Sequence, residues 1–122
     1  MWGLRLVSRI VTEPKVRTDI WVAAQVRMCD LAFIPAVVSR RGDPIAGAVL
    51  LKVNRLAAGC IVFSQVRDME GALGWMRGTG KDPVPEPDAD QYIARQAKYD
   101  PDIWVIEIED RDGKYQFPGK VS

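Results

Sequence analysis

Alternating apolar and polar positions predict a β-meander in the first half of the chain. In the segment 46–56, Val49 and Val53 point to one face of a strand, whereas Lys52 and Asn54 point to the other. Turn residues separate this strand from an apolar segment on each side. Short connections favour antiparallel neighbours, so we expect a three-stranded antiparallel unit. Its two flanking strands are predicted at 36–40 and 60–66.

A further strand is predicted near the C-terminus. In 103–109 the even-numbered residues are apolar, and Glu107 and Glu109 lie on the opposite face. An Asp-Gly pair at 112–113 is typical of a tight hairpin turn. We therefore expect a last short strand at 114–117.

Two segments carry the signals of helices. Thr18 is a good N-cap residue, and apolar residues at helical spacing follow it, which predicts a helix over 19–32. Asp88, with Gln91 three residues later, has the form of a capping box for a second helix. Pro101 ends that helix. The apolar side of each helix is expected to cover the sheet.

The segment between the meander and the second helix has weaker signals. Residues 68–76 are interpreted as a short helix that two glycines weaken. Residues 77–87 are rich in glycine and proline and predict an exposed loop. Trp75 and Met76 lie beside this loop, and both residue types are enriched at protein interfaces. We therefore predict that Trp75 and Met76 form an exposed contact for a partner.

Together these elements predict an α+β fold. Its sheet is expected to be mostly antiparallel, with four to five strands, and two main helices are expected to pack on one face of it. One globular domain is predicted at 16–118. Residues 1–15 are predicted to be an N-terminal extension, either a short strand or a disordered segment, and 119–122 a tail.

Composition excludes more chemistry than it reveals. The 122 residues are 48% hydrophobic and carry a net charge of +1, so there is no overall basic field for nucleic acid. The chain has no histidine, which excludes Ser-His and Cys-His catalysis and imidazole zinc ligands. Two cysteines are too few for a four-thiolate metal site, and the apolar neighbours of Cys29 and Cys60 predict buried thiols. We expect neither a metal nor a cofactor.

The sequence also predicts where the protein works. No apolar run approaches the roughly 20 residues of a membrane span. Arg5 and Arg9 interrupt the apolar N-terminus, where a signal peptide needs an unbroken apolar region. We expect a cytoplasmic protein with no membrane contact.

Charged residues of the predicted sheet form a candidate ligand site. If the last strand joins the meander, Glu107 and Glu109 lie near Lys52 on one face. Arg41 and Arg55 add cations, so the five residues together are candidates for binding an anion. The same residues are more typical of solvated cross-strand ion pairs.

Four spaced motifs, in order along the chain, resemble those of a known family. They are TDIWVAA at 18–24, RRGD at 40–43, KVNR at 52–55 and YDPDIWV at 99–105 continuing to EDRDG at 109–113. The chain resembles the bacterial domain-of-unknown-function family 1491 over about 16–117. The resemblance implies a compact bacterial cytoplasmic protein, and it brings no established activity.

Two classes of function stay open. The first is a non-enzymatic interaction or accessory module with a protein partner, including a homodimer. It is favoured because the sequence shows no catalytic constellation, and because it predicts a free sheet edge and an exposed Trp75–Met76 segment. The alternative is a small enzyme or anion-binding protein that uses the Arg, Lys and Glu residues of the candidate site. RNA binding across the sheet needs exposed aromatic residues, and Phe63 and Trp104 are predicted to be buried.

Overall fold

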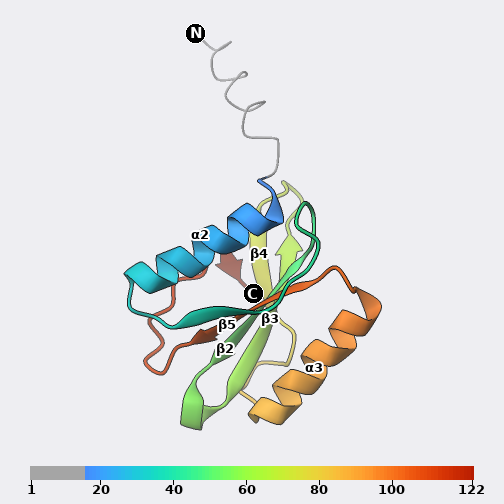
Figure 1. Cartoon of the computed structure of the whole chain (residues 1–122). Coiled ribbons are helices and arrows are strands. Elements are labelled where there is room, and N and C mark those ends of the chain that lie inside the picture. The colour runs from blue at the N-terminus through green and yellow to red at the C-terminus, as the bar shows by residue number, and fades with distance from the viewer. Residues whose placement is uncertain (1–15) are drawn as a thin grey trace, which may run out of the picture.

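The structure, a computed structural model, describes residues 16–122, and it consists of one twisted sheet with two long helices (Figure 1). The predictions made for residues 1–15 lie outside the described residues. In chain order the elements are α2 (Thr18–Leu31), β1 (Ala36–Arg40), β2 (Val49–Asn54), a 3₁₀ turn (Leu56–Ala58), β3 (Cys60–Arg67), β4 (Leu73–Arg77), α3 (Glu86–Tyr99), β5 (Trp104–Glu109) and β6 (Lys120–Val121).

The sheet is mixed because β5 lies between β1 and β2. The strand order is β1-β5-β2-β3-β4-β6. β5 runs parallel to β2 and β6 parallel to β4, whereas the other neighbours are antiparallel. The α+β class with two helices is confirmed. The prediction of a mostly antiparallel sheet is wrong, because the sheet is mixed. The predicted number of four to five strands is slightly low, because the sheet formed by residues 16–122 has six.

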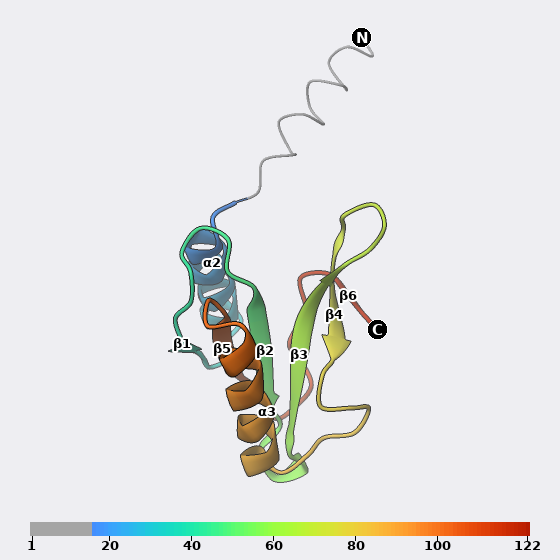
Figure 2. The ribbon, with the colours of Figure 1, turned by 90° about the vertical axis from the view of Figure 1, so that its right-hand side faces the viewer.

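The two helices cover opposite faces of the sheet. α2 packs through Val22 on the face that carries Leu51, and α3 packs through Ala89 on the face that carries Leu50. Successive strand residues point to opposite faces, so the expectation of two helices on one face is wrong. The physical reason is that β2 is buried at five of its six positions and therefore needs cover on both sides. Figure 2 shows α3 running along β2 and β3.

The helices begin where backbone geometry, rather than side-chain capping, favours it. Arg17 is the N-cap of α2, and the hydroxyl of Thr18 instead donates a hydrogen bond to the carbonyl oxygen of Gly47 at 2.9 Å. The N-cap of α3 is Pro85, three residues before the predicted cap Asp88, and a proline lies in the first turn of the helix. Proline has a fixed φ near the helical value and lacks an N–H that would be unpaired there. The predicted capping box is therefore wrong.

The segment predicted as a short helix is a β-hairpin that places Trp75 in the core. Asp68 Oδ1 accepts N–H groups of Glu70 and Ala72, and this turn directs β4 back along β3. Trp75 is 0% exposed, and its indole Nε1 donates to the carbonyl oxygen of Pro118. The prediction that Trp75 is an exposed contact is therefore wrong, since a β-strand points it to the face under α2. Met76 points the other way and is 50% exposed.

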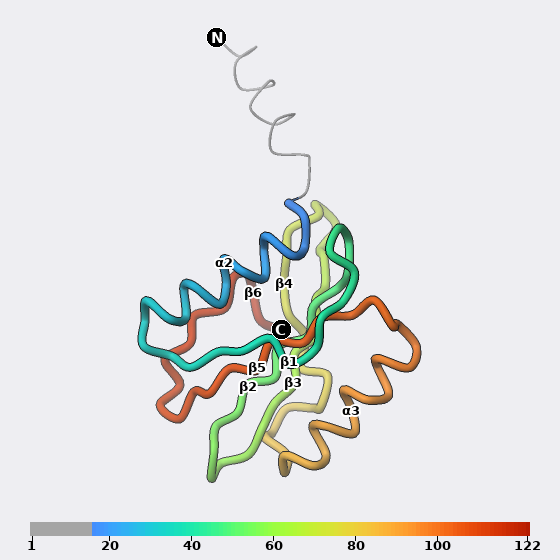
Figure 3. The backbone as a smooth tube through the Cα atoms, in the orientation of Figure 1, coloured from blue at the N-terminus to red at the C-terminus, as the bar shows by residue number. Residues whose placement is uncertain are grey.

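The C-terminal segment packs on the same face as α2. The buried carboxylate of Asp110 accepts the N–H groups of Lys114 and Tyr115, which holds the turn after β5. The turn is not followed by the expected strand at 114–117, because Tyr115 and Phe117 lie against the core instead. The chain then returns to β4, where residues predicted as a tail form β6 (Figure 3).

Both cysteines are free and buried, which confirms the prediction of buried thiols. Burial raises the pKa of Cys29 and of Cys60 above the usual range of a thiol. A raised thiol pKa lowers the thiolate fraction at neutral pH, so neither residue has the character of a reactive cysteine.

Candidate functional site

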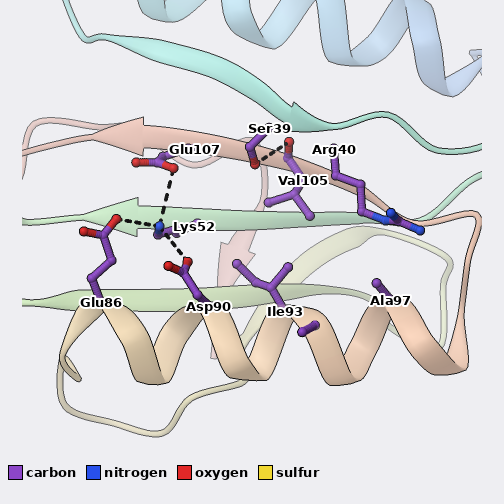
Figure 4. Close-up of a pocket in the computed structure, with 10 residues that line it drawn as sticks. Ser39, Arg40, Lys52, Glu86, Asp90, Ile93, Ala97, Val105 and Glu107 are labelled. Atoms are coloured by element: carbon purple, nitrogen blue, oxygen red, sulfur yellow. Dashed lines mark hydrogen bonds and ion pairs between the residues drawn. The ribbon is translucent and has the colours of Figure 1, made fainter.

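An open groove of about 570 Å³ lies between α3 and the sheet face that α3 covers. Figure 4 shows charged side chains at both ends of the groove and apolar side chains between them. One end holds Lys52, Glu86, Asp90 and Glu107. We call this groove, with the residues that line it, the Lys52 groove.

Lys52 lies at the acidic end of the groove and is only 5% exposed. Its Nζ donates to Glu86 Oε2 at 2.7 Å and to Asp90 Oδ1 at 2.8 Å, both on α3. Glu107 Oε1, on the neighbouring strand β5, is 3.4 Å from the same nitrogen. The lysine therefore joins β2 to α3 and to β5 through one ammonium group.

The carboxylates around Lys52 keep it charged. Burial by itself lowers the pKa of Lys52, but the hydrogen bonds to Asp90 and Glu86 and the charge of Glu107 outweigh it, so the pKa stands well above the usual value. A lysine that acts as a nucleophile or general base needs a pKa lowered toward neutrality. Lys52 thus has the electrostatics of a fixed cation. Three carboxylates surround this single ammonium, which leaves the end of the groove acidic.

The other end of the groove is basic. Arg40, on β1, donates from Nη2 to the carbonyl oxygen of Pro101 at 3.0 Å. Its Nε is buried and has no hydrogen-bond partner among residues 16–122. Ser39 lies beside it, and Ile93, Ala97 and Val105 form the apolar floor between the two ends.

The structure brings together two of the five residues predicted for a ligand site. Lys52 and Glu107 meet in the ion pair described above. Glu109 lies on the same face but is exposed and pairs in register with Asn54. Arg41 lies over the ring of Trp104, 5.0 Å from its centroid, on the opposite face. Arg55 lies next to Gly113, where its guanidinium approaches the turn after β5.

Sequence reasoning missed the two acidic residues of α3. Glu86 falls in the predicted loop 77–87, because the helix is predicted to begin at Asp88, and Asp90 is not among the five candidate residues. With the helix start known, Glu86 and Asp90 are four residues apart and share one helix face. Spacing alone does not reveal that this face turns toward Lys52, because the strand that carries Lys52 is 34 residues away from Glu86 in sequence.

A second surface stands out on α2. Ile20, Ala24, Arg27 and Leu31 are all exposed and follow one another at i, i+4, i+7 and i+11, the spacing of a helix-packing seam. Ile20 is 57% exposed and Leu31 is 67% exposed. We call these four residues the α2 seam. By contrast, the exposed positions of α3 are mostly charged or polar.

An apolar groove of about 550 Å³ adjoins this surface, between α2 and β1. β1 is an edge strand of the sheet formed by the described residues. Val26 and Ile34 lie within the groove, and Val37, which also lines it, is 58% exposed. Exposed apolar groups that gather in this way often mark a site of protein interaction.

The described residues include neither a membrane-spanning helix nor a metal site of acidic and sulfur ligands. Over 16–122, neither helix has the length and apolarity that a bilayer span requires. Within the same range, no three Asp, Glu or Cys side chains are grouped so that they could hold a metal ion.

A family model described as "Protein of unknown function (DUF1491)" matches residues 16–118. The chain belongs to the DUF1491 family. The match covers the sheet from β1 to β5, both helices and the segment that packs beneath α2. The resemblance seen in the sequence motifs is thereby confirmed.

Two solved structures of a DUF1491 protein from Caulobacter crescentus are similar to this chain. The crystal structure is 44% identical, covers 88% of this chain and 100% of its own, and superposes with a TM-score of 0.78. The NMR structure is also 44% identical, covers 88% and 96% of the two chains, and has a TM-score of 0.75. Both relatives are bacterial.

The solution structure of protein Atu0922 from A. tumefaciens shares the fold at 19% identity. It covers 80% of this chain and 87% of its own, with a TM-score of 0.65. None of the curated proteins matches the chain.

Proposed function

We propose that this protein is a non-enzymatic interaction module of the bacterial cytoplasm, and that it associates with a second copy of itself through the α2 seam. The observation that carries the proposal is the apolar character of α2 on both sides. Val22 packs inward on the sheet while Ile20 and Leu31 face outward. Exposed apolar side chains that line up on one side of a helix often mark a contact with another protein.

The seam is self-complementary when two copies meet in antiparallel orientation. Reversing the order Ile20, Ala24, Arg27, Leu31 places Ile20 opposite Leu31 of the second copy. The small Ala24 then faces Arg27, whose long apolar stem can lie across it. A two-fold axis repeats both contacts, as in most homodimers.

Charge does not oppose this association. The chain carries a net charge of +1, so two copies repel each other weakly. α2 itself carries Asp19, Arg27 and Asp30, a mixture of signs rather than a single-sign field. Antiparallel packing also places the opposite ends of the two helix dipoles side by side.

The alternative of a small enzyme or anion-binding protein has less support. Of its five residues, Arg41 lies on the opposite face from Lys52, and Arg55 lies by the turn after β5. The ammonium of Lys52 is already surrounded by carboxylates. An anion approaching Lys52 would therefore meet excess negative charge.

Sedimentation velocity over a range from micromolar to millimolar protein tests the proposal. We expect a dimer for the wild-type chain and a monomer for Ile20→Glu and Leu31→Glu, since each buries a charge in the dimer. Met69→Glu is the matched control, because Met69 is a fully exposed apolar residue in the turn between β3 and β4. A wild-type monomer throughout the range, or equal dissociation by Met69→Glu, contradicts the proposal.

A further inference from the structure

We propose that the Lys52 groove binds a small zwitterion of the size of a dipeptide, with its ammonium at the acidic end and its carboxylate at Arg40. The groove has opposite charges at its two ends and an apolar floor between them (Figure 4). This site is independent of the α2 seam, since it lies on the sheet face that α3 covers.

The acidic end has acceptor capacity left for a second ammonium. Glu86, Asp90 and Glu107 bring three negative charges to the single cation Lys52. The side chains of Glu86 and Asp90 are 50% and 57% exposed, so their outer oxygens are accessible. Each carboxylate has about four lone-pair positions, and one ammonium cannot fill all of them.

The basic end has donors left for a carboxylate. A guanidinium has five N–H donors, and within the described chain Arg40 uses one nitrogen, Nη2, for the carbonyl oxygen of Pro101. Its buried Nε has no partner among residues 16–122. A ligand carboxylate can accept from the remaining N–H groups of the guanidinium. The hydroxyl of Ser39, which also lines the groove, donates to the carbonyl oxygen of Val105 at 3.5 Å.

The spacing of the two ends sets the size of the ligand. Figure 4 shows Asp90 at the acidic end and the guanidinium of Arg40 beside Ala97 at the other end. Asp90 and Ala97 are seven residues apart on α3, which is roughly 10 Å along the helix. A hydrogen bond of roughly 3 Å at each end leaves roughly 5 Å between the charged groups of a ligand, which is more than one residue spans and within the roughly 7 Å reach of an extended dipeptide. Ile93 and Val105 offer apolar contact to a side chain in between. A free amino acid is too short to reach both ends, and a tetrapeptide is too long.

Titration of the ¹⁵N-labelled full chain with glycyl-leucine, followed by amide chemical shifts, tests the proposal. We expect saturable shifts at Ser39, Arg40, Glu107 and the first two turns of α3. N-acetyl-glycyl-leucine lacks the ammonium, and glycyl-leucinamide lacks the carboxylate. We expect each to bind at least about tenfold more weakly than glycyl-leucine, because each loses charge-assisted hydrogen bonds.

Two pairs of variants separate a binding site from a general surface effect. Arg40→Ala should weaken glycyl-leucine about tenfold or more, whereas Arg41→Ala, its neighbour on the opposite face, should leave binding unchanged. Glu107→Gln should weaken binding, whereas Glu109→Gln, on the same strand beyond the groove, should not. The amide spectrum and thermal melting of each variant show whether it is folded.

Three results would overturn the proposal. The first is the absence of saturable shifts in the wild-type chain at millimolar glycyl-leucine. The second is equal binding of the dipeptide and its two blocked analogues, or of free leucine and tetraglycine. The third is an equal loss of affinity in a folded Arg40→Ala variant and in Arg41→Ala.

Discussion

The ammonium nitrogen of Lys52 lies 2.8 Å from Oδ1 of Asp90, and this contact joins the second strand of the sheet to the helix that covers it. Glu86 accepts from the same nitrogen one helical turn earlier. The lysine is 5% exposed, whereas the helix carboxylates are about half exposed. Water therefore screens the carboxylates but hardly reaches the ammonium group. The pairing thus contributes more than a pair that is fully in water.

Removing this cation should weaken the attachment of α3. We expect Lys52→Met to lower the free energy of unfolding by about 1–3 kcal/mol, because three carboxylates then repel one another without a partner. Urea unfolding followed by tryptophan fluorescence measures the change. Lys114→Met, at an exposed lysine in the turn after β5, is the control and should change stability by less than about 0.5 kcal/mol. Equal stability of the two variants would contradict this role of Lys52.

The contribution of Lys52 should also depend on pH at the alkaline end. Its folded-state pKa is raised, so the stability that it contributes is fully present below about pH 10.4, the pKa of an unfolded lysine, and is lost as the pH rises through the folded value. We expect the difference in unfolding free energy between wild type and Lys52→Met to be constant from pH 7 to about pH 9.5 and to shrink above about pH 10.5. A difference that grows with pH would contradict a raised pKa of Lys52 in the folded protein. Burial raises the pKa of Tyr115 too, but this residue is present in both proteins and cancels.

Trp75 and Met76 should differ sharply although they are neighbours. Trp75 is 0% exposed and stacks near Trp21 at a centroid distance of 6.1 Å. Trp75→Ala should cost about 3–5 kcal/mol of stability, since it leaves a cavity under α2. Met76→Ala, at a half-exposed position on the other face of β4, should cost less than about 1 kcal/mol. Denaturant unfolding compares them, and similar losses would contradict the assignment of Trp75 to the core.

The thiols should report opening of the fold. Because Cys29 and Cys60 are buried and their pKa values are raised, we expect Ellman's reagent to modify neither residue in the folded protein at pH 7. In denaturant both should react within minutes. Rapid reaction of one thiol in the folded chain would show that its burial is incomplete.

Local sequence patterns predict the positions of many elements because each pattern is set by nearby residues. The alternation around Lys52 and that around Glu107 correspond to β2 and β5, and the helical spacing after Thr18 corresponds to α2. At Trp75 the same approach fails, because a short Gly-rich segment carries no clear period. The pairing with β3 makes it a strand.

The strand order and the site depend on contacts that are distant in sequence. The segments 36–40 and 46–56 are close in the chain and were expected to pair, yet β5 lies between β1 and β2. This insertion brings Glu107 next to Lys52 and Val105 next to Arg40. The cover of β2 on both faces likewise depends on where α3 returns, so Glu86 and Asp90 could not be placed at the site from local patterns alone.

Intermolecular paramagnetic relaxation tests the proposed α2 seam most directly. The Ala32→Cys variant, substituted just past the end of α2, carries a nitroxide and is prepared without ¹⁵N. It is mixed with ¹⁵N-labelled wild type. Antiparallel packing predicts selective broadening of the amide signals around Ile20 in the ¹⁵N-labelled chain and no broadening on α3. Broadening that is absent at millimolar protein, or that falls on Leu31 or on α3 instead, would contradict the account.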